Sequence, residues 1–354
     1  MRRNGRFVLQ VLLSLAVSFA FVAFSLRHTD LDAVGKAMAA AAPVPVLGYL
    51  GILLVVHVIK TARWGLLLRP LGTVTLRRLN SASAVGFMLM VILPLRLGEL
   101  ARPLLVSRPS LGDESRLPRA AAIASCLVER VVDSLAVGVL AIVSLQYLAP
   151  SGDAAKLVER GATLLTFAFS ALCIGLAVAF FTREKTVQRL RRVLQPFSPS
   201  LAQRAALVLD RFIVGLQLGG ARNMLWFFGL TVGYWCLHIW GFWMVAHAFD
   251  LPITPLMAAT VLACQVVGIM IPAGPGMVGT SQFFTQLGIS IFLPASLTVP
   301  ELAARAAGYS NTIWLLQFGQ QVLTGVVFLA AGHVSLRGLF DRWEGDPLAS
   351  ENTP

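Results

Sequence analysis

Six apolar stretches of about the length needed to cross a lipid bilayer constrain this chain more than any other feature. A helix rises about 1.5 Å per residue, so roughly 20 apolar residues span a hydrocarbon core of about 30 Å. Only 13% of the residues are charged and 56% are hydrophobic, too few charges for the surface of a soluble protein. We therefore expect an all-α polytopic membrane protein. Its six full transmembrane helices are expected at residues 7–26, 44–59, 120–148, 161–181, 224–249 and 308–331.

Two further apolar regions, residues 80–106 and 255–293, are interrupted at their middle by helix breakers. The first contains Pro94 and Gly98, and the second carries Pro and Gly residues throughout 272–279. Proline removes a backbone donor and clashes with the preceding turn, so neither region can form one continuous helix. We predict that both are re-entrant broken hairpins, which return to the side of the membrane from which they started.

The distribution of basic residues predicts the orientation of these segments. With a cytoplasmic N-terminus and two re-entrant hairpins, 21 of the 29 Lys and Arg residues fall in cytoplasmic segments and 5 outside. Cytoplasmic loops of membrane proteins carry such an excess of positive charge. A first hairpin that crossed the membrane would instead place the basic segments 60–78 and 108–119 on opposite sides. We therefore expect both termini in the cytoplasm.

Under this layout one transmembrane domain, residues 1–340, divides near residue 150 into two halves of the same plan. Each half, 1–150 and 151–340, contains two spans, a broken hairpin and a third span, so the second half is inverted relative to the first. Inverted repeats of this kind are common among secondary transporters. The basic segment 183–222 is either a solvated connector or an amphipathic helix on an anionic leaflet. Residues 341–354 are expected to form a disordered cytoplasmic tail.

Six ionisable residues fall inside the apolar segments, where a charge costs roughly 2.5–3.5 kcal/mol to insert. They are Arg96, Glu99 and Arg102 in the first hairpin and Glu129, Arg130 and Asp133 in the stretch 120–148. Helical spacing allows Glu99 to pair with Arg102, and Arg130 with Asp133. Glu129 and Asp133 share a face and need a second cation, for which Arg96 or Arg102 is the expected complement. Two interpretations stay open: charge pairs that hold the hairpin in place, or a headgroup or ion site in a cavity.

Several other kinds of chemistry find no support. The net charge of +12 is explained by cytoplasmic loops, so no nucleic-acid partner is expected. No metal or cofactor is expected either, because the four cysteines lie in apolar runs without metal-ligand spacing. Motifs of hydrolases, metalloproteases and P-loop enzymes are missing, which disfavours an enzyme. Neutral polar residues of the last span, Asn311, Gln317, Gln320 and Gln321, are expected to form interhelical hydrogen bonds.

Four motifs occur in order along the chain: Lys60-Thr-Ala-Arg63-Trp64, Pro94-Leu-Arg96-Leu-Gly-Glu99 with Arg102, Glu129-Arg130-Val-Val-Asp133, and Pro275-Gly276-Met-Val-Gly279. Together they resemble the lysylphosphatidylglycerol synthase transmembrane family, also called flippase-like membrane proteins. The resemblance covers nearly the whole chain and implies a bacterial or archaeal inner-membrane protein. In the best-understood members this module moves an aminoacylated phospholipid between leaflets, and a separate C-terminal soluble domain modifies the lipid. That domain is not expected here, since about 20 residues follow the last span.

The resemblance implies a protein that binds and translocates a phospholipid or lipid-linked headgroup. The implied substrate-binding residues are Arg63, Arg96, Glu99, Arg102, Glu129, Arg130, Asp133, Pro275, Gly276 and Gly279. The alternative is a membrane-embedded transferase, or its accessory subunit, that uses Glu99 or Glu129 as a base. A homo-oligomer is left open. One departure matters: the family often carries an acid after the Pro-Gly-x-x-Gly turn, where this chain has Gln282.

Overall fold

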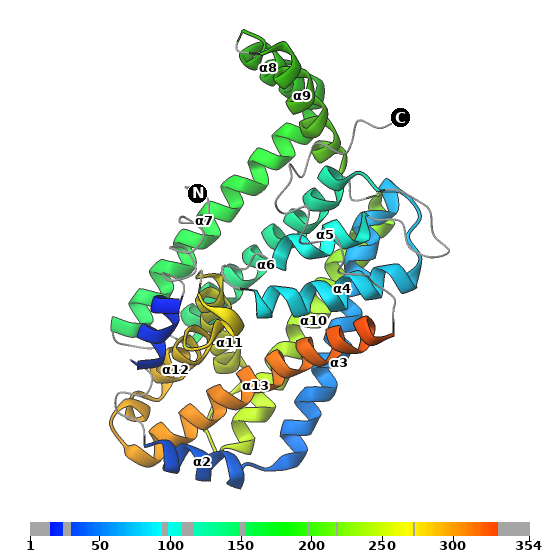
Figure 1. Ribbon diagram of the computed structural model, residues 1–354. Coiled ribbons are helices and arrows are strands. Elements are labelled where there is room, and N and C mark those ends of the chain that lie inside the picture. The colour runs from blue at the N-terminus through cyan, green and yellow to red at the C-terminus, as the bar shows by residue number, and fades with distance from the viewer. Residues whose placement is uncertain are drawn as a thin grey trace.

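Helices make up all the regular structure in the part of the chain that the structure describes. The structure is a computed structural model that describes residues 15–23, 30–93, 98–107, 117–148, 153–196, 198–216, 219–271 and 273–331. No strand occurs in these ranges, as Figure 1 also shows. The expected all-α class is thus confirmed. The helical segments long and apolar enough to cross a membrane are Pro43–Leu71, Val158–Phe181, Ala221–Ala248 and Pro300–Ala330.

Five long helices cover five of the six predicted spans. They are α3 (Pro43–Leu68), α6 (Arg119–Leu148), α7 (Asp153–Phe181), α10 (Ala221–Ala248) and α13 (Pro300–Ala330). Of the first predicted span, 7–26, residues 15–23 are helical and the remainder lies outside the described residues. The full arrangement of six spans and two re-entrant hairpins therefore stays a prediction.

Helix α3 is longer than the sequence pattern suggested. The apolar run ends at Ile59, but no residue there breaks a helix, and α3 continues to Leu68, followed by the 3-10 turn η1 (Arg69–Leu71). Pro70 and Gly72, the latter at φ +149°, then turn the chain away. Lys60 and Arg63, which the orientation argument counted as loop residues, are consequently part of a helix.

The first hairpin consists of α4 (Leu76–Ile92) and the short α5 (Ala101–Val106). Pro94 and Arg96, at its tip, lie outside the described residues. Its two ends meet, because the Arg78 guanidinium at the start of α4 donates a hydrogen bond to the Val106 carbonyl at the end of α5. The helix is therefore interrupted between α4 and α5, as predicted, and the re-entrant course of the hairpin stays a prediction.

The second hairpin consists of α11 (Pro255–Met270), the 3-10 turn η3 (Pro275–Met277) and α12 (Thr280–Phe292). At 16 and 13 residues, its arms are about 24 and 20 Å long, less than a hydrocarbon core. Gly268 lies against Phe284 and Gly288 against Val261, so the arms run antiparallel. Gly279 turns the chain at φ +86°, a conformation that L side chains rarely adopt.

Contacts between the two halves of the chain follow a reciprocal pattern. Helix α3 of the first half packs against α10 of the second, α4 packs against α13, and α11 packs against α6 (Figure 1). Each hairpin thus lies against the last long helix of the other half. The largest core cluster joins Tyr49 of α3, Phe242 of α10 and Tyr309 of α13. This pattern suits two similarly built halves, and the inverted repeat itself stays a prediction.

Three shorter helices lie around this bundle. Helix α2 (Leu31–Ala40) packs against α13, and its N-terminus is capped by the Asp30 side chain. The basic connector contains α8 (Arg183–Leu194) and α9 (Pro199–Val214), which pack together and extend from the end of α7 in Figure 1. Arg183 and Asp210 join them through hydrogen bonds of 2.6 and 2.7 Å. The predicted tail, 341–354, lies outside the described residues.

Candidate functional site

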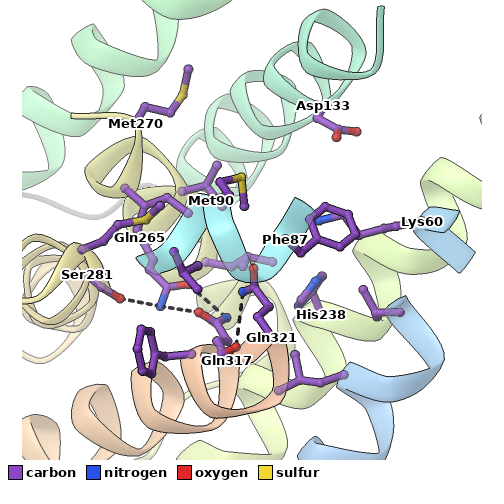
Figure 2. A pocket seen from close by; sticks show the side chains of 18 of the residues that line it. Lys60, Phe87, Met90, Asp133, His238, Gln265, Met270, Ser281, Gln317 and Gln321 are labelled. Carbon is purple, nitrogen blue, oxygen red and sulfur yellow. Dashed lines mark hydrogen bonds between the residues drawn. The ribbon is translucent and has the colours of Figure 1, made fainter. Parts of the chain in front are cut away.

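A cavity of about 380 Å³ lies among the long helices and both hairpins. Apolar and aromatic side chains form much of its wall, and Figure 2 shows part of it. Its charged lining residues are Lys60, Glu99, Arg130 and Asp133. Its neutral polar lining residues are His57, Ser134, Tyr234, His238, Gln265, Ser281, Gln317, Gln320 and Gln321. A cavity of this size, with an apolar wall and a few polar side chains, is suited to binding a ligand that has a polar group.

Behind the charged wall, Arg63 of α3 is the centre of a buried network. Its guanidinium donates to both oxygens of Asp133 at 2.5 and 2.8 Å and to Glu129 at 3.4 Å. It also donates to the Thr231 hydroxyl of α10 at 3.1 Å. The Arg63 residue is only 1% exposed. A buried charge needs partners of this number and quality to offset its loss of water.

Arg102 of the first hairpin supplies the second cation for this network. Its Nη1 donates to Oε2 of Glu129 at 3.0 Å, which confirms that the hairpin complements the acids of α6. The guanidinium carbon also lies 4.4 Å from the ring centres of both Trp64 and Phe87. The close approach of α5 to α4 depends on Gly86, since a Cβ there would lie 2.1 Å from the Arg102 Cγ.

Two of the predicted ion pairs were wrong. Arg102 binds Glu129, and Glu99 pairs with Arg130 at 3.5 Å. Asp133, the expected partner of Arg130, is bound by Arg63 and also accepts a hydrogen bond from Tyr234 at 2.5 Å. The predictions considered spacing along one helix, whereas in the folded chain these side chains face neighbouring helices.

Lys60 lies on the cavity wall one helical turn before Arg63. Its ammonium lies 5.2 Å from the centre of the Phe87 ring and 5.7 Å from that of Tyr234. Among the described residues it forms no hydrogen bond or ion pair, although Asp133 is close enough to attract it electrostatically. Both oxygens of Asp133 are already occupied by Arg63 and Tyr234. Lys60 is therefore a cation with spare hydrogen-bonding capacity inside the cavity.

A second polar group, made of amides and hydroxyls, occupies another part of the wall (Figure 2). Gln265 of α11 donates to the Ser281 hydroxyl at 3.0 Å and to the side-chain Oε1 of Gln317 at 3.2 Å. Gln317 of α13 donates in turn to the Tyr49 hydroxyl at 2.9 Å. These bonds confirm interhelical hydrogen bonding for Gln317. The prediction was wrong for Asn311, Gln320 and Gln321, whose side-chain amides donate to other residues of α13. The Gln321 Oε1 atom is buried and accepts no hydrogen bond within the described ranges.

The tip of the second hairpin closes another side of the cavity. Gly276 and Met277 line it, and the Gly276 carbonyl accepts a 2.7 Å hydrogen bond from the Trp314 indole. Pro275 and Gly279 shape the turn and are not among the lining residues. Gln282, at the position where the family often carries an acid, is buried and accepts a 2.8 Å bond from the Gly279 amide. A neutral side chain is thus sufficient to cap the start of α12.

Sequence reasoning missed part of the cavity wall. Lys60 belonged to a motif but was not predicted to be a substrate-binding residue. The same is true of the other lining residues His57, Tyr234, His238 and Gln265, which belonged to no motif. A signal existed for Lys60, since residues three apart share a helical face and Arg63 belongs to the same motif. The histidines carried no comparable signal. No cluster of three His, Cys, Asp or Glu residues that could hold a metal is found in the described part of the chain.

The fold and the site define a multi-pass α-helical membrane protein with a charged internal cavity. The lysylphosphatidylglycerol synthase TM region family matches residues 11–338, nearly the whole chain, and the protein belongs to this family. The expected resemblance is therefore confirmed, and with it a lipid-related function. No curated protein and no solved structure matches the chain.

Proposed function

We propose that this protein translocates a lipid or lipid-linked headgroup between the leaflets of a bacterial inner membrane. The observation that carries the proposal is the cavity of about 380 Å³, which places charged and hydrogen-bonding groups among transmembrane helices. Charges buried in a membrane usually mark the path of a substrate or ion. The hydrocarbon tails would stay in the bilayer while the headgroup passes through the polar interior.

The charged residues of the cavity wall all come from the first half of the chain, but hydroxyl groups of the second half bind the network, so its contacts cross between the halves, which suits alternating access. Arg63 and Asp133 come from the first half, whereas Tyr234 and Thr231, which bind them, come from the second. Relative movement of the halves would change these contacts, and a headgroup in the cavity would compensate for those that are lost. Both termini are proposed to lie in the cytoplasm, as the charge distribution predicts.

The arrangement suits transport better than an embedded transferase. A general base must reach the proton that it removes, directly or through one water molecule. Glu129 is 3% exposed, is not among the cavity-lining residues, and has arginines bound to both of its oxygens. Glu99 lines the cavity but is paired with Arg130. Neither acid is presented as a free base.

Reconstitution tests the proposal. Proteoliposomes containing labelled lipids in one leaflet should show faster leaflet exchange with the protein than without it, and the recovered lipid should have an unchanged mass. Asp133→Asn, which weakens the binding of Arg63 beside the cavity, should slow exchange. Glu301→Gln, which removes an exposed acid at the start of α13, is the control and should not. A chemically altered lipid would favour the transferase. If the protein accelerated the exchange of none of the lipids tested, the proposal would be refuted.

A further inference from the structure

We propose that the cavity selects an anionic headgroup in which a phosphate is joined to a hydroxyl-rich group, without an aminoacyl cation. This inference rests on the proposed function and specifies its substrate class. Lys60 would bind the phosphate, and the amides of Gln317 and Gln321 would bind the hydroxyls. A phosphoglycerol lipid and an isoprenoid phosphate that carries a sugar share this chemistry.

The charge of the cavity carries the first step. Among the described residues, the network contains four cations, Lys60, Arg63, Arg102 and Arg130, and three carboxylates, Glu99, Glu129 and Asp133. Each carboxylate is bound by at least one arginine, so the excess positive charge remains on Lys60. Lys60 is half-buried and lies near Asp133, but both Asp133 oxygens are bound by Arg63, so among the described residues no carboxylate is left to serve as its counter-charge. A phosphate in the cavity would supply it.

The surroundings of Lys60 favour a phosphate, which has several oxygens, over an anion that can make only one contact. The Lys60 ammonium lies 5.2 and 5.7 Å from the centres of the Phe87 and Tyr234 rings, and its side chain starts from helix α3. The buried Nε2 of His57 and Nδ1 of His238, both on cavity-lining residues, have no partner in the described part of the chain. An anion with several oxygens can accept from the Lys60 ammonium and from whichever of these ring nitrogens carries a proton.

The glutamine side chains on the other part of the cavity wall provide the second step of the argument. Figure 2 places Lys60 and Phe87 apart from Gln265, Gln317 and Ser281, so one cavity offers a cationic region and a neutral hydrogen-bonding region. Amide side chains both donate and accept, as hydroxyl groups do, and the buried Oε1 of Gln321, which has no partner among the described residues, would become an acceptor for a hydroxyl if this side chain turned toward the cavity. A cationic aminoacyl headgroup would need a free carboxylate, and the cavity presents none among its described residues.

Binding of short-chain lipids to the purified, full-length protein tests this inference. Trp235 and Trp314 line the cavity, so tryptophan fluorescence reports occupancy. The probes are dioctanoyl phosphatidylglycerol, dioctanoyl phosphatidic acid, dioctanoyl lysyl-phosphatidylglycerol, dioctanoylglycerol and a ten-carbon isoprenyl phosphate that carries one hexose. We expect the tightest binding from the first or the last probe, weaker binding of phosphatidic acid, and the weakest binding of the uncharged and lysyl lipids. The better of the two leading probes identifies the source of the headgroup.

Variants assign the roles. Lys60→Met should weaken binding of the leading probe by about tenfold or more, because a charge-assisted hydrogen bond is lost, while Lys60→Arg should retain most of it. Gln317→Leu should lower the affinity for the leading probe to that for phosphatidic acid. Lys156→Met, which removes an exposed lysine of α7, is the matched control and should bind normally. If Lys60→Met does not fold, the order of probe affinities for the native protein and for Lys60→Arg still tests the proposed substrate class.

Two results would overturn the inference: equal binding by Lys60→Met and the native protein, or tighter binding of the lysyl lipid than of phosphatidylglycerol. The inference and the proposed function fail separately. Selective binding without leaflet exchange would refute transport and leave the substrate class in place. Exchange of lipids irrespective of phosphate and hydroxyl groups would refute the substrate class and leave transport in place.

Discussion

Arg63 binds Asp133 through two hydrogen bonds, from Nη1 to Oδ1 at 2.5 Å and from Nη2 to Oδ2 at 2.8 Å. The pair joins α3 to α6, and the Tyr234 and Thr231 hydroxyls of α10 bind the same two side chains. Three long helices are thus held together at one point beside the cavity. A buried bidentate ion pair depends on geometry as well as charge. Its stability should therefore change even in a variant that keeps the charge.

Arg63→Lys is expected to destabilise the protein. An ammonium keeps the charge, but it cannot reproduce the planar fork that binds both oxygens of Asp133 and Thr231. We expect a loss of about 1–3 kcal/mol in the free energy of unfolding, measured by denaturation in detergent micelles. Arg305→Lys is the matched control, because Arg305 forms an exposed pair with Glu301 on α13 and should lose about 0–1 kcal/mol. Equal losses in the two variants would contradict the role assigned to Arg63.

Glu129 bridges two arginines, which gives a charge reversal a specific outcome. Glu129→Gln leaves Arg63 and Arg102 short of a partner and should cost on the order of 1–3 kcal/mol. In the double variant Arg102→Glu with Glu129→Arg, one ion pair is restored, but the new arginine faces Arg63. The double variant should therefore stay less stable than the native protein in thermal unfolding. Full recovery of stability would show that Arg63 and Glu129 do not interact appreciably.

The architecture was largely predictable because it depends on signals that are local in the sequence. Apolar runs of spanning length and the breakers around Gly98 and Gly279 predicted the long helices and the two broken hairpins. The predicted end of the helix at Ile59 was wrong, because hydropathy marks only where the apolar run stops. The helix itself continues until a residue such as Pro70 ends it.

The pairing of charges was less predictable because it depends on tertiary contacts. Arg63 and Asp133 are 70 positions apart, and Arg102 and Glu129 are 27 apart. Spacing along one helix could only suggest partners three or four residues away, which produced the wrong pairs for Glu99 and Arg130. The excess of acids on α6 did correctly indicate that a cation must come from the hairpin, since that argument depends on charge balance alone.

Gly86→Ala is expected to displace the hairpin from the charged network. The added Cβ would lie 2.1 Å from the Arg102 Cγ and 3.1 Å from its Cα, so α5 would have to move away from α4. Such overpacking typically costs about 1–3 kcal/mol, and here the Arg102 pair with Glu129 would also be strained. Gly229→Ala, on α10 with no neighbour within 4 Å of the added atom, is the control and should be neutral or stabilising. Similar unfolding temperatures for the two variants would contradict the close approach.

Trp314→Phe is expected to loosen the tip of the second hairpin without unfolding the protein. The phenyl ring can retain the stack on Phe318, but the 2.7 Å hydrogen bond to the Gly276 carbonyl is lost. We expect a cost of about 0.5–1.5 kcal/mol and faster amide hydrogen exchange in residues 273–280. Trp240→Phe, at an exposed position of α10, should leave exchange in that turn unchanged. Unchanged exchange in Trp314→Phe would show that the indole does not anchor the tip.

Cysteine labelling tests whether the first hairpin is re-entrant. The hydrogen bond from Arg78 to Val106 brings its two ends together, so cysteines at positions 77 and 116 should be modified from the same face. Native Cys173 and Cys236 are exposed and must be replaced first, with Cys126 and Cys264 replaced for completeness. A membrane-impermeant maleimide should label both new cysteines in inverted vesicles and neither in intact cells, while a cysteine at position 36 should behave oppositely. Labelling of 77 and 116 from opposite faces would mean that the hairpin crosses the membrane. The second half would then no longer be inverted relative to the first, and an alternating-access mechanism based on inverted repeats would fail with it.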